Sequence, residues 1–94
     1  MKATVLPLVK KYHQEKAEEV YRTLSKYFPT SYDESGSIGK RYRRADVVGT
    51  PFCITIDDNT MNEGTVTVRF RDTMEQEVVK LDELVSFIEE RSRS

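Results

Sequence analysis

A cluster of basic side chains is the clearest chemical feature of this sequence. Residues 36–48 hold four of the chain's 15 Lys and Arg residues but one of its 16 Asp and Glu residues, although the whole chain carries a net charge of −1. The four basic residues are Lys40, Arg41, Arg43 and Arg44. A guanidinium group pairs with a phosphate in a bidentate way and stacks on a planar base. The cluster therefore favours binding of a polyanion, while the acidic remainder would limit indiscriminate binding.

Two further arginines, Arg69 and Arg71, are two residues apart in a segment that alternates between apolar and polar residues. In a strand, residues at this spacing point to the same face of the sheet. Contacts to a phosphate or a base, and ion pairs across the sheet to Glu75 or Glu77, are both consistent with this position. The basic residues at 40–44 likewise form a binding surface, a solvated helix face, or ion pairs with Asp46 and the acidic remainder of the chain.

The segment that carries the basic cluster has the pattern of a helix with two different sides. Ser37 is a good helix N-cap, and Gly49 is typical of a helix end. At about 100° per residue, Ile38, Tyr42 and Ala45 share one arc. The opposite arc holds Lys40, Arg43 and Arg44, with Arg41 on its border. The helix would therefore dock by one side and present guanidinium groups on the other.

Several side chains fit structural roles better than chemical ones. Asp46 is interpreted as an internal partner that orients an arginine. Tyr42, Phe52 and Cys53 are interpreted as core residues. His13 stands alone in the sequence, with no partner implied, and is interpreted as incidental.

Hydrophobic periodicity predicts the elements that position these residues. Strands are expected at 3–9, 30–33, 51–57, 65–71 and 74–80, and helices at 14–28, 37–49 and 82–91, with a hairpin loop at 58–64. Strands separated by helices should be parallel, and the last three, joined by short loops, should be antiparallel. We therefore expect one α/β domain, residues 1–94, in the order β-α-β-α-β-β-β-α, with a mixed five-stranded sheet and three helices.

Other kinds of site have little support. A single cysteine excludes an internal disulfide and a multi-cysteine metal site. Gly36 and Gly39 form neither a G-x-G-x-x-G nor a Walker pattern, although their amides could hold a phosphate. Residues 57–64 depart from the calcium-loop pattern at a ligand position, so no metal site is expected. The chain has no bilayer-spanning apolar run and no signal-peptide pattern, which favours the cytoplasm and no membrane partner.

Two motifs resemble one protein family. Residues 35–46 are SGSIGKRYRRAD, and residues 65–76 are TVTVRFRDTMEQ. Both are similar to segments of the anticodon-binding domains of glycyl-tRNA synthetases of the homodimeric class II type. Shorter matches near both ends extend the resemblance over nearly the whole chain. Two positions depart from the family pattern: Phe70, where a charged residue is expected, and Val47, where an acid is expected.

The resemblance implies a three-layer anticodon-binding fold and recognition of the anticodon stem-loop of glycine tRNA, whose second and third anticodon bases are cytosines. A carboxylate accepts a hydrogen bond from the exocyclic amine of cytosine, and Asp58, Asp72 and Glu75 lie at expected strand ends and loops. The expected tRNA-binding residues are Lys40, Arg41, Arg43, Arg44, Asp58, Arg69, Arg71, Asp72 and Glu75.

The resemblance also implies that the chemical step takes place in another domain. In this family a separate catalytic domain activates glycine with ATP and Mg, and the present chain has no class II catalytic motif. We therefore expect no catalytic activity and no cofactor in this chain alone. The isolated domain is expected to be a monomer, and the parent enzyme a homodimer.

Two other functional classes remain open at this point. A protein-interaction module could keep this fold without binding tRNA; loss of the basic helix would favour it, and here that helix is intact. A small α/β enzyme or a phosphate-binding signalling domain would need a nucleophile or an acid cluster at the carboxyl ends of the parallel strands. Residues 8–11 and 33–35 supply nothing convincing. RNA affinity that falls steeply as salt rises would distinguish a tRNA binder from both.

Overall fold

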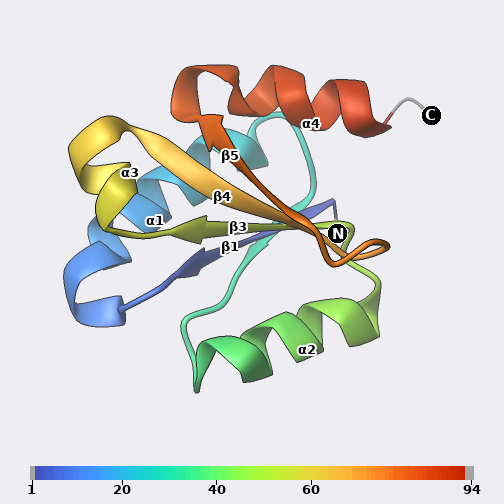
Figure 1. Cartoon of the computed structure of the whole chain (residues 1–94), viewed down its shortest axis with the longest axis horizontal. Coiled ribbons are helices and arrows are strands. Elements are labelled where there is room, and N and C mark those ends of the chain that lie inside the picture. The colour runs from blue at the N-terminus through green and yellow to red at the C-terminus, as the bar shows by residue number, and fades with distance from the viewer. Residues whose placement is uncertain (1, 93–94) are drawn as a thin grey trace.

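A mixed sheet of five strands forms the centre of the molecule (Figure 1). The computed structural model describes residues 2–92, so residue 1 and residues 93–94 of the predicted domain lie outside it. The strands are β1 (Ala3–Pro7), β2 (Thr30–Tyr32), β3 (Phe52–Ile56), β4 (Thr65–Phe70) and β5 (Gln76–Lys80). Their order is β2-β1-β3-β4-β5; β1 is parallel to β2 and β3, and β4 is antiparallel to β3 and β5. The predicted strand directions are confirmed.

Helices cover both faces of the sheet and give the fold its three layers. They are α1 (Lys10–Ser25), α2 (Ile38–Val48), α3 (Asp58–Glu63) and α4 (Leu84–Ser92), with a 3-10 turn, η1 (Leu81–Glu83), before α4. Figure 1 shows α2 on one side of the sheet and α1 and α4 on the other. Residues 2–92 thus contain four α-helices, one more than the sequence predicts. None of them is both long and apolar enough to cross a bilayer.

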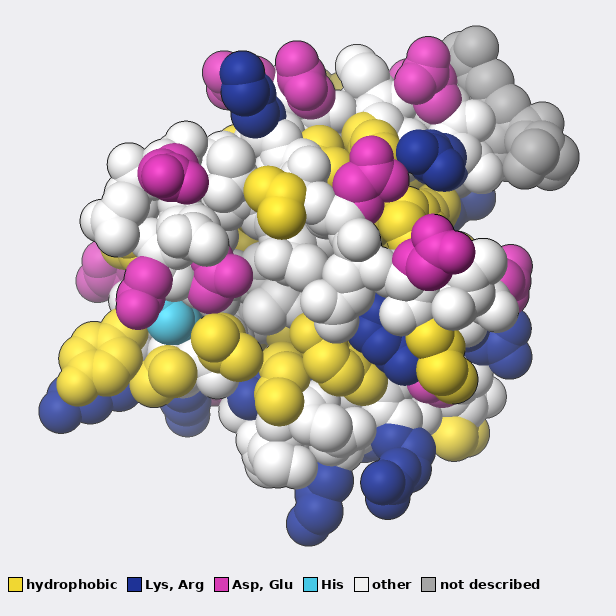
Figure 2. All heavy atoms as spheres, viewed as in Figure 1, with side chains coloured by type: hydrophobic (Ala, Val, Ile, Leu, Met, Phe, Trp, Pro, Cys, Tyr) yellow, Lys and Arg dark blue, Asp and Glu magenta, His cyan; other side chains and the backbone are white. Residues whose placement is uncertain are grey.

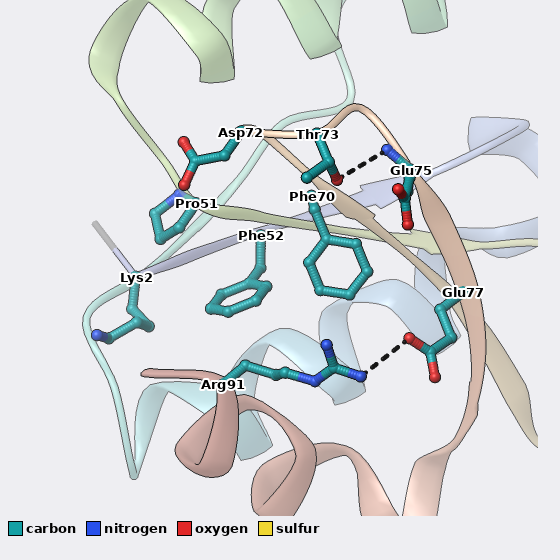
Figure 3. Close-up of a pocket in the computed structure, with 9 residues that line it drawn as sticks. All are labelled: Lys2, Pro51, Phe52, Phe70, Asp72, Thr73, Glu75, Glu77 and Arg91. Atoms are coloured by element: carbon teal, nitrogen blue, oxygen red, sulfur yellow. Dashed lines mark hydrogen bonds and ion pairs between the residues drawn. The ribbon is translucent and has the colours of Figure 1, made fainter. Parts of the chain in front are cut away.

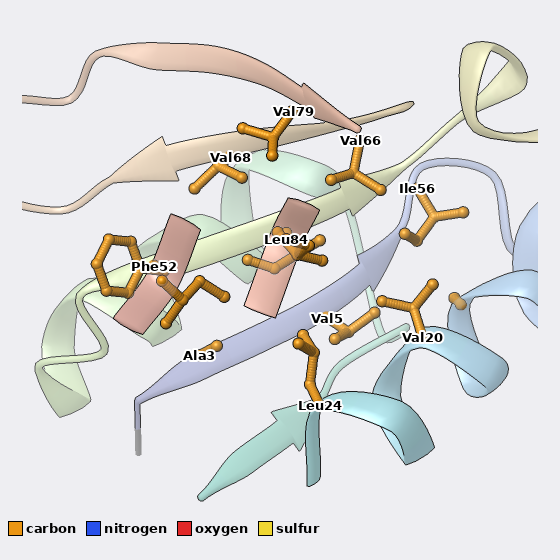
Figure 4. Packing of buried hydrophobic residues seen from close by; sticks show 13 residues of the cluster. Ala3, Val5, Val20, Leu24, Phe52, Ile56, Val66, Val68, Val79 and Leu84 are labelled. Atoms are coloured by element: carbon orange, nitrogen blue, oxygen red, sulfur yellow. The ribbon is translucent and has the colours of Figure 1, made fainter. Parts of the chain in front are cut away.

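The main core lies between the sheet and the pair of helices α1 and α4 (Figure 4). Val5, Ile54 and Val68 occupy matching positions on three neighbouring strands and are fully buried in it. Leu24 of α1 and Leu84 of α4 close it from the helix side. Alternate strand residues therefore supply this core, as the period-two pattern predicts.

A smaller cluster lies on the opposite face, between the sheet and α2. Its members are Leu6, Ala45 and Cys53, with Ile38 and Tyr42 packed against them. The predicted docking side of α2 is therefore confirmed. Helix α2 does not cover all of this face. Val78 of β5 lies on it, opposite to buried Val79, and is 67% exposed.

The segment at 58–64 is a helix, α3, and not the predicted hairpin loop. The Asp57 side chain accepts the Thr60 N–H at 3.2 Å, and the Thr60 hydroxyl accepts the Asp57 N–H at 3.1 Å, which forms a capping box. Gly64 ends the helix in the left-handed conformation, with φ of 71°. The polar composition of the segment concealed this helix, because its stability comes from end caps rather than from an apolar stripe.

Helix α1 begins at Lys10, four residues before its predicted start. The early start follows from His13, whose Nδ1 accepts the backbone N–H of Val9 at 3.0 Å and so satisfies a donor at the helix start. The helix ends at Ser25, short of its predicted end. Pro29 disfavours helical backbone at the residue before it, and a turn follows the helix instead.

The remaining boundaries differ by one to two residues, as helix and strand ends commonly do. Strand β1 stops at Pro7, β2 stops at Tyr32, and α4 begins at Leu84 after the 3-10 turn. Strand β5 begins at Gln76 because Met74 adopts φ of 61° in a tight turn after β4. This turn carries three of the predicted site residues, Arg71, Asp72 and Glu75.

Candidate nucleic-acid interface

The outer side of α2 carries an accessible basic surface. Ser37 accepts the Lys40 N–H at 3.3 Å at the start of the helix, and Gly49 ends it with φ of 80°, as predicted. Lys40 and Arg43 are exposed, and within residues 2–92 neither makes an ion pair. With three neighbours they line an open groove of about 410 Å³. Figure 2 shows dark blue side chains projecting below the molecule, where α2 lies in Figure 1.

The groove combines basic and aliphatic side chains. Its lining is Lys40, Arg43, Arg44, Val47 and Val48. Both valines are largely exposed. Val47 is the position where the family pattern has an acid, so its presence removes a carboxylate that would repel phosphate from this groove.

Arg44 belongs to the same surface but is held by local partners. Its Nε and Nη2 donate to the two carboxylate oxygens of Asp33 at 2.9 Å each, and Nη2 also donates to the Ser35 carbonyl at 2.5 Å. The side chain is still 49% exposed. Arg44 can therefore contact a ligand without losing these bonds, in an orientation that the protein has already set.

Arg41 does not lie on this surface. The sequence predicts it on the border of the exposed arc, whereas the structure buries it to 5% exposure. Its two terminal nitrogens donate to the carbonyls of Pro7 and Leu8, at the end of β1, and its Nε has no hydrogen-bond partner within residues 2–92. A long side chain near the docking arc can reach over the end of the sheet, where the two carbonyls accept its hydrogen bonds. The predicted exposure of Arg41 is thus wrong, because its side chain holds α2 against the end of β1.

Arg69 is also largely withdrawn from solvent. It forms two bonds to the Asp46 carboxylate, at 3.1 and 3.4 Å, and its guanidinium lies 4.7 Å from the centre of the Tyr42 ring. The hydrogen bond to Asp46 raises the pKa of Arg69. The side chain is 11% exposed. The expectation that Asp46 orients an arginine is confirmed, whereas an ion pair from Arg69 across the sheet to Glu75 or Glu77 is wrong.

Arg71 reaches from β4 to the end of α2. Its Nε donates to the Asp46 carbonyl at 3.1 Å, and its Nη1 lies 3.5 Å from Asp72 Oδ1. The side chain is 44% exposed. Arg71 therefore joins the basic surface of α2 to the turn between β4 and β5. It does not pair with Glu75 or Glu77 either; its acidic partner is its sequence neighbour.

The three candidate carboxylates do not form one group. Asp58 follows the end of β3, while Asp72 and Glu75 follow the end of antiparallel β4, so they lie at opposite ends of a strand about 20 Å long. Asp58 is 86% exposed and accepts the Nε2 hydrogen of His13 at 2.8 Å. His13 is 2% exposed; its Nδ1 accepts the Val9 N–H at the start of α1, and its Nε2 links α1 to Asp58 of α3. The interpretation of His13 as incidental is therefore wrong.

Asp72 and Glu75 are brought together at a pocket of about 480 Å³ (Figure 3). It lies where β3 begins, β4 ends and α4 makes its last turns. The lining residues are Lys2, Pro51, Phe52, Phe70, Asp72, Thr73, Glu75, Glu77 and Arg91. Sequence reasoning missed the aromatic wall of this pocket; the departure at Phe70 from the family pattern was the signal that could have found it.

Two reactive side chains, Cys53 and Tyr32, have raised pKa values. Burial raises the pKa of the Cys53 thiol to about 11, so Cys53 is a protonated core residue, as predicted. Burial and the hydrogen bond to Glu34 raise the pKa of Tyr32. Within residues 2–92 no three His, Cys, Asp or Glu residues are grouped as a metal site.

The sequence was compared with known protein families and structures. The family model described as "Anticodon binding domain" matches residues 2–91. The chain belongs to this family.

Relatives of this anticodon binding domain include glycine–tRNA ligases. The chain is 60% identical to the glycine–tRNA ligase of Clostridium perfringens over 94% of its length, and 57% identical to that of Clostridium tetani over 96%. In both cases it spans 19% of the relative. Among solved structures, it is similar to the RNA binding domain of threonyl-tRNA synthetase from Cryptosporidium parvum, with a TM-score of 0.86 and 32% identity. That match covers 95% of this chain and 23% of the other.

These comparisons confirm the predicted family and fold class of the anticodon binding domain. They extend over the α2 segment and the β4–β5 segment, the two regions where the structure places accessible candidates. Of the nine predicted site residues, Lys40, Arg43, Arg44, Arg71, Asp72 and Glu75 lie along one path from α2 to the pocket. Arg41 and Arg69 lie beneath this path, and Asp58 lies at the far end of the sheet.

Proposed function

We propose that this chain is the anticodon-binding domain of a glycine–tRNA ligase and holds the anticodon stem-loop of glycine tRNA. The observation that carries the proposal is the 60% identity to the Clostridium perfringens glycine–tRNA ligase over 94% of the chain. The aligned region is 88 residues long and therefore spans nearly all of the sheet and the helices.

The accessible surface supports this role. Lys40 and Arg43 are exposed and make no ion pair within residues 2–92, and Arg44 and Arg71 are exposed but oriented by protein partners. The 11 residues of α2 extend about 16 Å, so these groups form a row rather than a single point. Such a row suits the phosphates of a folded RNA loop, while the carboxylates at its end suit base edges.

The remaining parts of the parent enzyme follow from the same proposal. ATP and Mg act in a separate catalytic domain, and this chain contributes recognition without a cofactor. The parent ligase is a cytoplasmic homodimer, and the separate domain is a monomer. An accessory protein-interaction role has no specific observation in its favour.

The test is a titration of the ¹⁵N-labelled domain with the anticodon stem-loop of glycine tRNA, followed by amide shifts. We expect shifts along α2 and in the turn between β4 and β5. With four phosphate contacts, the slope of log affinity against log salt should be roughly −3. A loop with both cytosines replaced is the control and should bind more weakly. Equal binding of the two loops, or no binding of either, would contradict the proposal.

A further inference from the structure

The pocket between the β4–β5 turn and α4 has the chemistry of a nucleobase site. We propose that it takes one cytosine of the anticodon loop, with the base against Phe70 and its exocyclic amine on the Glu75 carboxylate. This inference rests on the proposed function and assigns one base-reading residue within it.

The size and wall of the pocket suit a flat aromatic ligand. Its volume of about 480 Å³ lies within the range of small-molecule sites, roughly 300–1,000 Å³. Phe70 is partly exposed, and its ring packs against Phe52 and Phe87 at centroid distances of 5.8 and 6.0 Å. Two neighbouring rings, together with the Arg91 guanidinium 5.5 Å from the centre of the Phe70 ring, therefore fix its orientation. A fixed, partly exposed ring is a platform on which a splayed base can stack.

The charges around the pocket favour a base edge over a phosphate. Three carboxylates face two cationic groups among the lining residues. Glu77 is bonded to Arg91 at 3.3 Å, and Asp72 lies 3.5 Å from Arg71. Glu75 is exposed, and its carboxylate has no partner within residues 2–92. It is thus the acceptor available to a ligand.

The backbone holds Glu75 beside Phe70. Its N–H donates to the Thr73 hydroxyl at 3.2 Å, and its carbonyl accepts the Phe70 N–H at 2.9 Å. Figure 3 shows the Glu75 side chain on the same side of the turn as the Phe70 ring. The stacking surface and the acceptor are therefore positioned together before any ligand arrives.

The pocket also meets the basic surface of α2. The Arg71 guanidinium contacts the Asp46 carbonyl in α2 and faces Asp72, which lines the pocket. An RNA backbone that follows Lys40, Arg43 and Arg71 would therefore reach the pocket entrance. This continuity favours an RNA base over a cationic protein side chain, although both fit an aromatic wall with carboxylates.

Cytosine and uracil give the sharpest test, because they differ at the edge that Glu75 would read. Cytosine presents an amine there, whereas uracil presents a carbonyl that a carboxylate repels. The affinity of the anticodon stem-loop would be measured with each of its two cytosines changed singly to uracil. For the unaltered domain we expect a loss on the order of tenfold at one of the two positions.

Two variants complete the experiment. In Glu75→Gln the amide can donate to uracil, so the preference for cytosine at that position should fall to about twofold. Glu15→Gln removes the same charge from an exposed position on α1, away from the pocket, and should keep the full preference. Amide shifts of residues 73–76 should saturate with the cytosine loop and diminish in Glu75→Gln.

The outcomes separate the two proposals. If the unaltered domain binds the loop but Glu75→Gln keeps the same cytosine preference, this inference is overturned and the proposed function stands. If no loop binds, both are overturned. A titration with arginine amide tests whether the pocket takes a cationic protein side chain instead. Saturable amide shifts at residues 73–76 with this probe, and none there with RNA, would assign the pocket to such a side chain and overturn the inference.

Discussion

The inner and outer sides of α2 carry the same kind of residue in different environments. Arg43 on the outer side is exposed and without an ion pair in the described part of the chain, whereas Arg41, two residues earlier, is buried against the end of β1. Both are part of one basic cluster in the sequence. The difference shows that residue type and spacing identify a basic helix but do not say which guanidinium groups a ligand can reach.

The same contrast is repeated at the end of β4. Arg69 is bound by the Asp46 carboxylate and covered by the Tyr42 ring, whereas Arg71, just after the strand, bonds the Asp46 backbone carbonyl and remains accessible. Buried arginines hold α2 on the sheet, and accessible ones are available for RNA. Substitutions on the two sides should therefore separate stability from binding.

The largest effect is expected for Arg41→Ala. It removes the donors for the Pro7 and Leu8 carbonyls and leaves a cavity beneath α2, so the free energy of unfolding should fall by about 2–4 kcal/mol. Urea unfolding followed by circular dichroism would measure it. RNA affinity, corrected for the folded fraction, should change less than about twofold, since the side chain is not accessible. If the Arg41→Ala variant kept its stability but bound RNA weakly, Arg41 would be a binding residue and not a structural one.

An intermediate effect is expected for Asp46→Ala. Arg69 would lose its carboxylate in a largely buried position, which should lower the free energy of unfolding by about 1–3 kcal/mol. The Arg71 bond should persist, because its acceptor is the backbone carbonyl of residue 46. Urea unfolding combined with amide shifts of Arg71 would check both statements. Unchanged stability would show that the ion pair contributes little.

The smallest effect on stability, with a clear effect on binding, is expected for Arg43→Ala. The free energy of unfolding should change by less than about 0.5 kcal/mol. Affinity for the stem-loop should fall roughly threefold to tenfold, and the salt slope by roughly 0.7, if this group contacts a phosphate. Arg22→Ala removes the same charge from an exposed position on α1 and is the matched control. Equal affinity losses in both variants would indicate a general charge effect.

Much of the fold could be predicted because the pattern of residues and the packing agree. Alternation in the strands reflects which side chains enter the core, and Ile38, Tyr42 and Ala45 do pack on the sheet. Helix α3 was missed because it depends on a capping box between Asp57 and Thr60 and carries no apolar stripe. The early start of α1 was missed because it depends on the side chain of His13.

The candidate site was predicted less completely, for a different reason. Lys40, Arg43 and Arg44 share an exposed face of α2. They could be predicted together because the geometry of a single helix sets which of its residues lie on one side. The pocket draws residues from the start of the chain, from β3, from the β4–β5 turn and from α4. No local pattern relates these segments, so Glu75 and Phe70 could not be placed together before the sheet was seen.

By itself the amino-acid sequence determined the order of the five strands and of three of the four helices within residues 2–92, the basic character of α2 and the resemblance to one family. Each of these depends on residues near one another in the chain. The tertiary structure alone decided which charges are accessible. Arg41 turns inward because its guanidinium donates to the Pro7 and Leu8 carbonyls at the end of β1, and Arg69 is withdrawn because α2 brings Asp46 and Tyr42 over β4. Burial of a charge depends on partners from distant segments, and only folding brings those partners together.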